Sequence, residues 1–372
     1  MKKLAILGAS YLQVPLIRKA KEMGIETHCF AWEDGAVGKD MADFFYPISV
    51  LDMEKIYSKA VEIGIDGITT IASDMPVPSI CYVAEKLNLI SNTFESSLFC
   101  TNKFLMRSKL IESRVLYPKF IEISHEDDFS LKNPFFQYTT FPYIVKPVDR
   151  SGSRGVNKIE NISELFNAVS IACEESFVKK CIVEEYIEGV EVSVETISWQ
   201  GNHFILAITD KVTTGAPFFV ELAHHQPSVL DQFIQNKIKE ETLKCLNTLN
   251  ITNGPSHSEF KITSDGNIFI IEVGARMGGD FIGSNLVELS TGFDFLKSTI
   301  NIALGSFEKP NFKFQKYAGV HFLSKETEKE LIFFEEHMEF EIEKEIFNRD
   351  LKNVTNSNER SGYFIYQSNK RI

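Results

Sequence analysis

The stretch from His257 to Phe281, HSEFKITSDGNIFIIEVGARMGGDF, constrains the fold more than any other part of this chain. At its centre, Asp265-Gly266 predicts a two-residue hairpin turn, because both central positions of that turn need a positive φ. Outward from the turn, the side chains of each strand alternate between two faces. The pattern predicts one apolar face packed on the core, in which Ile262 lies opposite Phe269 and Phe260 lies opposite Ile271.

On the other face, the same register places Glu259 directly opposite Glu272, with the two Cβ atoms about 5 Å apart. Two carboxylates at that spacing repel each other, and a divalent cation bound by both would remove the repulsion. The alternative is a surface hairpin whose acids are solvated, with Lys261 as a nearby partner. After the strand, Arg276 supplies a cation, and Gly278-Gly279 supplies a backbone that a ligand can approach closely.

The composition is that of an ordinary globular enzyme, and it argues against two classes of partner. Of the 372 residues, 39 are Lys or Arg and 51 are Asp or Glu, which gives a net charge of −12. This balance argues against nucleic acid and anionic membranes as partners, and no apolar run is long enough to span a membrane. The six cysteines lack metal-binding spacing, so we expect reduced thiols in a cytoplasmic protein.

Residues 1–95 predict a Rossmann-like domain, in which short apolar strands alternate with helices. The first strand, residues 4–7, ends at Gly8, and a helix and a second strand follow. That turn has one glycine where the dinucleotide fingerprint has three, which argues against nicotinamide binding. Asp74 follows a later strand, where a carboxylate either contacts a ligand at the sheet edge or caps the next helix.

Residues 142–147, PYIVKP, predict a strand with a lysine near its end, and a loop rich in Ser and Gly follows. Small residues allow consecutive N–H groups to converge on phosphate oxygens, and Ser hydroxyls add donors. A plain hairpin loop is the alternative, but the coupling to a lysine-bearing strand favours phosphate binding. The candidate residues are Lys146, Ser151, Gly152, Ser153, Gly155 and Val156.

Residues 181–191, CIVEEYIEGVE, predict a strand that continues into an extended linker. Extended backbone offers N–H and C=O groups that can pair with an adenine, and the Glu191 carboxylate can accept hydrogen bonds from both ribose hydroxyls. Four glutamates near one strand are otherwise explained as a solvated face.

In their order along the chain, these motifs resemble the ATP-grasp superfamily over about residues 1–305. The resemblance implies ATP and Mg²⁺ (or Mn²⁺) as cofactors. One departure is Gly274, where many members have an asparagine that serves as a further metal ligand. The implied roles are phosphate contacts from Lys103 and Lys146, a lid loop at 151–156, adenine contacts from Glu184, Glu185 and Ile187, a ribose contact from Glu191, and metal binding by Glu259 and Glu272.

Residues 217–227, PFFVELAHHQP, together with GPSHSEFK and EVGARMGGDF, resemble the ATP-grasp ligases that join two amino acids through an amide. This likeness implies a Mg²⁺-ATP-dependent ligase that joins a carboxylate to an amine through an acyl phosphate, releasing ADP and phosphate. We expect Arg276 and Lys146 to be catalytic. The expected substrate contacts are Glu221, His224, Arg276, Gly279 and, at the sheet edge, Asp74.

The predicted fold class is therefore α/β, with a Rossmann-like domain at 1–95, an ATP-grasp domain at 96–305 whose mobile lid covers about 115–187, and a small C-terminal domain at 306–372. Residues 361–366 predict a closing strand without recognised chemistry. Two rival functions remain, a carboxylating or purine-pathway ATP-grasp enzyme and a non-catalytic ATP-binding regulatory protein. The sequence leaves open the carboxylate, the amine and the assembly state, for which a homodimer is one option.

Overall fold

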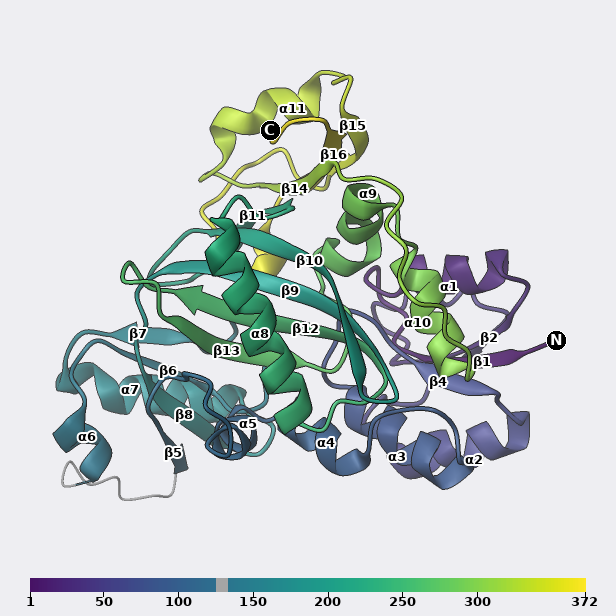
Figure 1. Ribbon diagram of the computed structural model, residues 1–372, viewed down its shortest axis with the longest axis horizontal. Helices are drawn as coiled ribbons and strands as arrows, with labels where there is room; N and C mark the ends of the chain where they lie inside the picture. The colour runs from purple at the N-terminus through teal and green to yellow at the C-terminus, as the bar shows by residue number, and fades with distance from the viewer. Residues whose placement is uncertain (125–132) are drawn as a thin grey trace.

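The computed structural model describes residues 1–124 and 133–372, which form a mixed α/β fold with three sheets (Figure 1). The predicted lid at about 115–187 includes residues 125–132, which lie outside the described residues. Within the described part of the chain, no helix has both the length and the apolar character needed to cross a membrane.

The N-terminal sheet has four strands in the order β3-β2-β1-β4, and all of its pairings are parallel. Gly8, with a φ of 101°, lets the chain turn sharply out of the buried first strand. The predicted alternation of strands and helices is observed here. Its elements are β1 (Lys3–Leu7), α1 (Val14–Glu22), β2 (Glu26–Phe30), β3 (Phe44–Tyr46), α2 (Met53–Ile63), β4 (Gly67–Thr69) and α3 (Val77–Leu87).

Two short helices, α4 (Phe94–Phe99) and α5 (Lys103–Leu110), lead into a second four-stranded sheet whose strands are all antiparallel, in the order β5-β8-β6-β7. We call this sheet with its helices the lid, because it occupies the segment predicted to be one. The lid has a separate apolar core. Its elements are β5 (Phe120–Ser124), α6 (Pro134–Tyr138), β6 (Tyr143–Pro147), β7 (Asn157–Ile159), α7 (Ile162–Glu175) and β8 (Lys180–Glu185).

The third sheet has eight strands in the order β13-β12-β9-β10-β11-β14-β16-β15, and every neighbouring pair is antiparallel. Helix α8 crosses one face of this large sheet (Figure 1). The elements up to residue 305 are β9 (Val190–Trp199), β10 (Asn202–Thr213), β11 (Glu221–Gln226), α8 (Gln232–Thr248), β12 (Gly254–Ile262), β13 (Ile268–Gly274), the π-helix η1 (Ile282–Leu286), α9 (Val287–Thr291) and α10 (Phe295–Ala303).

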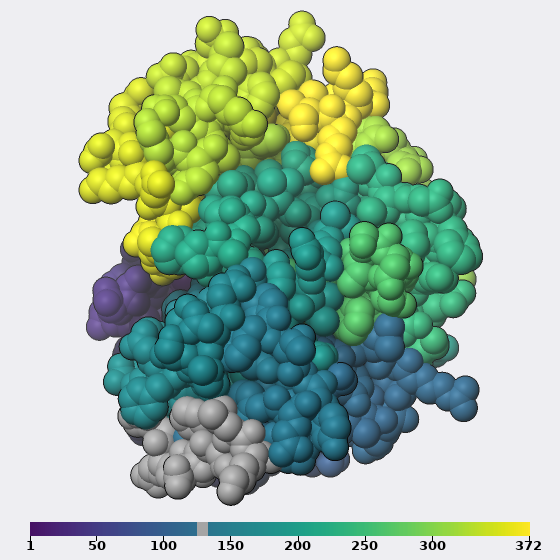
Figure 2. All heavy atoms as spheres, turned by 90° about the vertical axis from the view of Figure 1, so that its left-hand side faces the viewer, coloured from purple at the N-terminus to yellow at the C-terminus, as the bar shows by residue number. Residues whose placement is uncertain are grey.

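The strands after residue 305 continue the large sheet, because β14 pairs with β11. This C-terminal part and the lid lie at opposite ends of the face shown in Figure 2, with the central strands between them. The remaining elements are β14 (Tyr317–Leu323), η2 (Glu328–Glu330), α11 (Leu331–Glu335), β15 (Glu341–Ile346), η3 (Ser357–Glu359) and β16 (Gly362–Ser368).

The hairpin between β12 and β13 has a longer turn than predicted, so the two-residue turn is wrong. Thr263 donates its N–H to the carbonyl of Asn267 at 3.0 Å, which leaves a loop of residues 264–266. Gly266 has a φ of 80°, as the left-handed position of a three-residue loop requires. Asn267 Nδ2 also donates to Asp265 Oδ2 at 2.7 Å, which holds this loop shape.

The longer turn moves the register of β13 by one residue near the loop, and such a shift reverses the faces. The core face is therefore formed by Phe260, Ile262, Ile268 and Ile270, instead of the predicted set with Phe269 and Ile271. A β-bulge next to Glu259 then restores the predicted pairing of Glu259 with Glu272. The pairing of the two acids is confirmed, although the register behind it was wrong.

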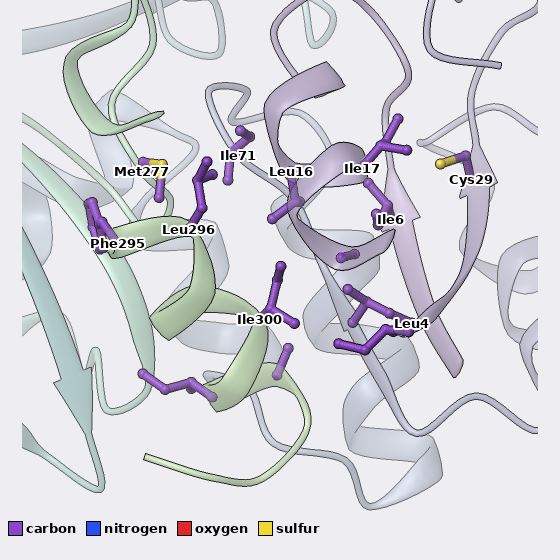
Figure 3. Packing of buried hydrophobic residues seen from close by; sticks show 14 of the residues in the cluster. Leu4, Ile6, Leu16, Ile17, Cys29, Ile71, Met277, Phe295, Leu296 and Ile300 are labelled. Carbon is purple, nitrogen blue, oxygen red and sulfur yellow. The ribbon is translucent and has the colours of Figure 1, made fainter. Parts of the chain in front are cut away.

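The N-terminal domain is packed against α10 through one apolar cluster, part of which is shown in Figure 3. Leu16 of α1 and Ile300 of α10 are both completely buried in this cluster. Beside it, the N–H of Ala72 donates to the carbonyl of Met277 at 3.1 Å. These contacts fix the loop after β4 against the segment that follows β13.

We predict that Ile300→Ala lowers the free energy of unfolding by about 2–5 kcal/mol, because it leaves a cavity where the N-terminal domain and α10 meet. Ile332→Ala is the matched control, since Ile332 is 49% exposed, and it should change stability by less than about 0.5 kcal/mol. Urea unfolding of both variants measures the difference. Equal losses in the two variants would contradict this account of the interface.

Candidate active site

A cavity of about 380 Å³ is bounded by the lid, the large sheet, the N-terminal domain and the C-terminal part. Asp74 lines a smaller neighbouring cavity of about 140 Å³ instead, and Gly155 lines neither of the two. The predicted site residues that line the larger cavity are Lys103, Lys146, Ser151, Gly152, Ser153, Val156, Glu184, Glu185, Ile187, Glu191, Glu221, His224, Glu259, Glu272, Arg276 and Gly279.

Lys146 on β6 reaches the cavity and forms an ion pair with Glu184 on β8, the neighbouring strand of the lid. Its Nζ lies 2.6 Å from Glu184 Oε2, and Arg107 Nε donates to the other oxygen of Glu184 at 2.7 Å. Burial lowers the pKa of Lys146, and the Glu184 carboxylate opposes that effect. The Glu184 side chain is thus already paired with two cations. Arg107, a lone arginine on α5, was not predicted.

Lys103 is the first residue of α5, and Asn102 caps this helix by accepting a hydrogen bond from the N–H of Leu105 at 3.0 Å. Lys103 Nζ donates to the carbonyl of Arg150 at 2.7 Å and lies 3.1 Å from Glu272 Oε2. The cap therefore holds a cation between the start of the Ser- and Gly-rich loop and one of the paired acids. A phosphate oxygen would be stabilised at that position.

The loop 151–156 turns through successive left-handed residues, with φ values of 68° at Gly152 and 56° at Ser153. Turns of this kind can present neighbouring N–H groups to an anion. Ser153 Oγ donates to the carbonyl of Phe219 at 3.3 Å, so the loop contacts the segment before β11 across the cavity.

Glu259 and Glu272 pair across β12 and β13, and both line the cavity. Among the described residues there is no group of three or more His, Cys, Asp or Glu side chains that could hold a metal ion. Two carboxylates nevertheless fit Mg²⁺, which usually takes one or two protein carboxylates and completes its shell with phosphate oxygens and water.

His257 lies behind the acid pair, on the same strand as Glu259. Its Nδ1 is hydrogen-bonded to Glu195, and its Nε2 lies 3.2 Å from Glu259 Oε1. Burial lowers the pKa of His257, but the Glu195 carboxylate and these hydrogen bonds raise it to about 9 overall. These contacts favour the cationic imidazole, whose charge offsets part of the negative charge. Glu195 also accepts the N–H of Gly278 at 2.9 Å, which positions the glycine pair after β13.

Lys211 on β10 is the central cation of the cavity floor, and it was not predicted. Its Nζ lies 2.8 Å from Glu191, 2.7 Å from Glu259 and 3.6 Å from Glu221. Burial opposes its charge, but the three carboxylates raise the pKa of Lys211 well above its usual value. A single lysine in a strand belongs to no sequence motif. Its role becomes clear only from the pairing of β9, β10 and β11.

Arg276 is held by a carboxylate from the N-terminal domain. Its Nε and Nη2 donate to Asp74 Oδ1 and Oδ2 at 2.8 and 2.9 Å. Asp74 does not cap α3, because the N-cap residue of this helix is Pro76 and no side chain caps it, so the capping alternative is wrong. A Cβ atom on Gly274 would lie 2.7 Å from Asp74 Oδ1 and 3.2 Å from Arg276 Cζ. Glycine at 274 thus leaves the space in which this ion pair forms.

Glu221 and His224 on β11 line the opposite wall. Glu221 Oε2 accepts a hydrogen bond from Ser357 Oγ at 3.3 Å. His224 is 1% exposed, and its Nδ1 has no hydrogen-bond partner within the described ranges. Its Nε2 lies 3.9 Å from Asp280 Oδ2.

The C-terminal part contributes Ser357, Asn358 and Arg360 to the cavity wall, and these residues belong to no motif that predicts a site. Arg360 Nη1 and Nη2 donate to Asp280 Oδ2 and Oδ1 at 2.7 and 2.8 Å. Asp280 follows the Gly278-Gly279 pair, so this bidentate ion pair connects the segment after β13 to the segment before β16.

Comparison with known proteins matches residues 139–284 to the ATP-grasp domain. The alanine–anticapsin ligase of Bacillus subtilis is 26% identical over 275 residues, which cover 65% of this chain and 57% of the relative. The chain thus spans little more than half of that relative's length. These matches confirm the predicted ATP-grasp resemblance, and homologues of this chain are named ligases.

Two solved structures show the same fold over nearly the whole chain. The L-amino acid ligase from Bacillus licheniformis has a TM-score of 0.82 at 24% identity, covering 100% of this chain and 94% of that one. An N5-carboxyaminoimidazole ribonucleotide synthetase has a TM-score of 0.80 at 14% identity, covering 99% of this chain and 93% of that one. The predicted ATP-grasp fold is confirmed by this likeness.

We predict that Lys211→Met lowers the free energy of unfolding by about 3–5 kcal/mol, because it leaves three carboxylates close together without their shared cation. Lys244→Met is the matched control, since the Lys244 side chain is 49% exposed and pairs with Glu241 on the surface of α8; its loss should cost less than about 1 kcal/mol. Denaturant unfolding at neutral pH measures both. A loss for Lys211→Met no larger than that of the control would refute the proposed charge balance.

We also predict that Gly274→Ala and Asp74→Ala are coupled, because the added methyl group and the Asp74 carboxylate compete for one space. Gly274→Ala alone should cost about 1–3 kcal/mol of stability. In the Asp74→Ala background the same change should cost at least about 0.5 kcal/mol less. Unfolding of the two single variants and the double variant completes the cycle, and strictly additive losses would contradict the steric explanation.

Proposed function

We propose that this chain is a Mg²⁺-ATP-dependent ligase that forms an amide between a carboxylate and an amine and releases ADP and phosphate. The observation that carries the proposal is the convergence in one cavity of the facing Glu259 and Glu272, the buried Lys103 and Lys146, and Arg276. The names of the relatives, an alanine–anticapsin ligase and an L-amino acid ligase, support amino acids or similar metabolites as substrates.

In this proposal the nucleotide lies between the lid and the large sheet. The backbone of residues 184–187 contacts the adenine, and Glu191 accepts hydrogen bonds from the ribose. The phosphates reach Lys103, Lys146 and the loop at 151–156, where two cations and directed N–H groups offset their charge. Bound by Glu259 and Glu272, Mg²⁺ would supply further neutralisation of the phosphate oxygens.

In the first step an oxygen of the substrate carboxylate attacks the γ-phosphorus of ATP. The new P–O bond forms as the bond to ADP breaks, and the product is an acyl phosphate. The chain does little covalent chemistry here, so positioning and charge stabilisation by Lys103, Lys146 and Arg276 account for the rate.

In the second step the amine attacks the acyl carbon. The C–N bond forms, the C–O bond to phosphate breaks, and hydrogen phosphate leaves. Of the three protons on the starting ammonium group, one stays on the amide, one leaves with phosphate and one passes to solvent. The guanidinium of Arg276, which Asp74 holds through two hydrogen bonds, can donate to the oxygen that gains negative charge. Closure of the lid would exclude water, which competes with the amine for the acyl phosphate.

The test is release of ADP and phosphate with pairs of amino acids as substrates, followed by mass spectrometry of the product. We expect turnover that needs Mg²⁺ and stops in excess EDTA. Glu272→Gln should lower kcat at least about a hundredfold, because half of the carboxylate pair is neutral. The control Glu328→Gln alters a side chain that is 53% exposed and should keep full activity.

Three outcomes would contradict the proposal. Turnover that depends on bicarbonate and not on an amine would favour a carboxylating enzyme. ATP binding without any turnover would favour a regulatory protein. Full activity of Glu272→Gln would show that the acid pair does not hold the metal ion.

A further inference from the structure

The smaller cavity beside the proposed active site, which we call the side cavity, has no role in the proposed reaction. It lies between the N-terminal domain, which contributes Leu51, and the Ser- and Gly-rich loop with its preceding residues, which contribute Arg150 and Arg154. Lys103 and Glu272 line both cavities, so the two are neighbours at the charges that would hold the phosphates and the metal ion. The volume of the side cavity, about 140 Å³, is below the roughly 300–1,000 Å³ of pockets for drug-sized ligands, so its ligand would have only a few atoms.

The carboxylates on the wall of the side cavity already have donors. Asp74 and Glu272 are held by the cations described above, at 2.8 and 3.1 Å. Both oxygens of Asp149 accept backbone hydrogen bonds, from the N–H of Phe177 at 3.2 Å and from the N–H of Val178 at 3.1 Å. The three acids therefore do not depend on the two arginines of this wall.

The two arginines have no such partners. Within residues 1–124 and 133–372, neither the Arg150 nor the Arg154 guanidinium forms an ion pair with a carboxylate. The ring centroid of Phe177 lies 3.8 Å from the guanidinium carbon of Arg150, whose Nε donates to the carbonyl of Glu175. Arg154 Nε donates to the carbonyl of Ser151 at 3.1 Å. Each of these hydrogen bonds uses one of the five guanidinium donors, so both groups are oriented and their terminal nitrogens can bind a ligand.

The charge of Arg154 is only partly compensated by its neighbours. Burial and the charge of Arg150 lower the pKa of Arg154, and the Glu175 carboxylate opposes these effects only in part. Glu175 does not line the side cavity. An oxyanion that contacts both guanidinium groups would offset their repulsion, because each group presents a planar pair of N–H donors that matches two oxygens.

We propose that Arg150 and Arg154 bind a small oxyanion of the phosphate class in the side cavity, and that hydrogen phosphate moves to this site after the amide has formed. The second part rests on the proposed function, which places the release of phosphate beside Lys103 and Glu272. The anion site itself is supported by the two arginines and the cavity alone. No bond forms or breaks in this movement, because the C–O bond to phosphate has already broken and the ion keeps its proton.

Such a site lets phosphate leave before the other products. ADP and the amide would occupy the larger cavity, whereas the side cavity lies at the surface, since Leu51 on its wall is 43% exposed and Arg154 is also exposed. The carboxylates of Asp149 and Glu272 keep negative charge near the bound ion, which weakens its binding and favours its release. The side cavity is therefore a site that phosphate occupies briefly on its way out.

The first test measures phosphate binding without turnover. The broadening of the phosphorus NMR signal of inorganic phosphate is recorded with the full chain, Mg²⁺ and a non-hydrolysable ATP analogue that fills the γ-phosphate position. We expect phosphate to bind under these conditions, and the double variant Arg150→Met with Arg154→Met to bind it at least about tenfold more weakly, because charged hydrogen bonds are lost. The inference is overturned if the analogue abolishes phosphate binding, which would make the γ-phosphate position the only site, or if the double variant binds phosphate like the wild type.

Two further variants separate this site from a general effect of charge or folding. Arg114→Met is the matched control, since Arg114 is exposed and lines neither cavity, and it should leave phosphate binding unchanged. Leu51→Trp fills the side cavity without altering a charge, and Leu51 does not line the larger cavity. This variant should bind phosphate at least about tenfold more weakly and bind the ATP analogue as the wild type does. Wild-type phosphate binding by Leu51→Trp would place the ion elsewhere and overturn the inference.

The second test follows the release of phosphate. In a single turnover, the amide is measured after a chemical quench, and free phosphate is measured with a fluorescent phosphate-binding protein. We expect both to appear together in the wild type, whereas in Leu51→Trp the release of phosphate should be at least about tenfold slower than amide formation. Equal rates in Leu51→Trp overturn the release step. No amide from the wild type overturns the proposed function, and phosphate binding in the first test distinguishes that failure from a failure of the anion site.

Discussion

The site depends above all on one buried lysine that neutralises three carboxylates. Glu191, Glu259 and Glu221 come from β9, β12 and β11, and Lys211 on β10 reaches each of them. Burial of four charged groups is costly, and it is offset only when each has a partner. Without the cation, the strands would bring three like charges together on one face of the sheet. The order β12-β9-β10-β11 therefore creates both the acidic floor of the cavity and the charge that permits it.

The other charges are paired by residues from different parts of the chain, so the site exists only when those parts are assembled. Arg107 joins Glu184 of the lid to the carbonyl of Ile271 on β13 at 2.6 Å, a link between two sheets. Asp74 of the N-terminal domain holds Arg276, and Arg360 of the C-terminal part holds Asp280. Each pair fixes one charged group of the cavity and one boundary between domains. The geometry of the cavity and the packing of the domains are thus supported by the same interactions.

What could be predicted from the sequence was the chemistry that short segments carry. Glu259 and Glu272 belong to one hairpin, so counting along it finds their pairing. The prediction of a two-residue turn was wrong because Asp265-Gly266 fits loops of two or three residues. The β-bulge that restores the register at Glu259 has no sequence signal. Arg360 and Asp280 lie 80 positions apart, and Lys211 is a single lysine in a strand. Such residues acquire a role only through strand order and domain contact, which no local pattern encodes.

Gly274 departs from the pattern of the superfamily that the motifs resemble, and a residue elsewhere in the chain explains this departure. Many members of that superfamily have an asparagine at this position, whereas here a Cβ atom would lie 2.7 Å from Asp74 Oδ1. Asp74 therefore occupies the space that a longer side chain would need, and it uses that space to hold Arg276 through two hydrogen bonds. A side chain at 274 would displace the carboxylate, and loss of the carboxylate would leave a buried arginine unpaired. The two positions constrain each other, so Gly274 is explained by a carboxylate from the N-terminal domain.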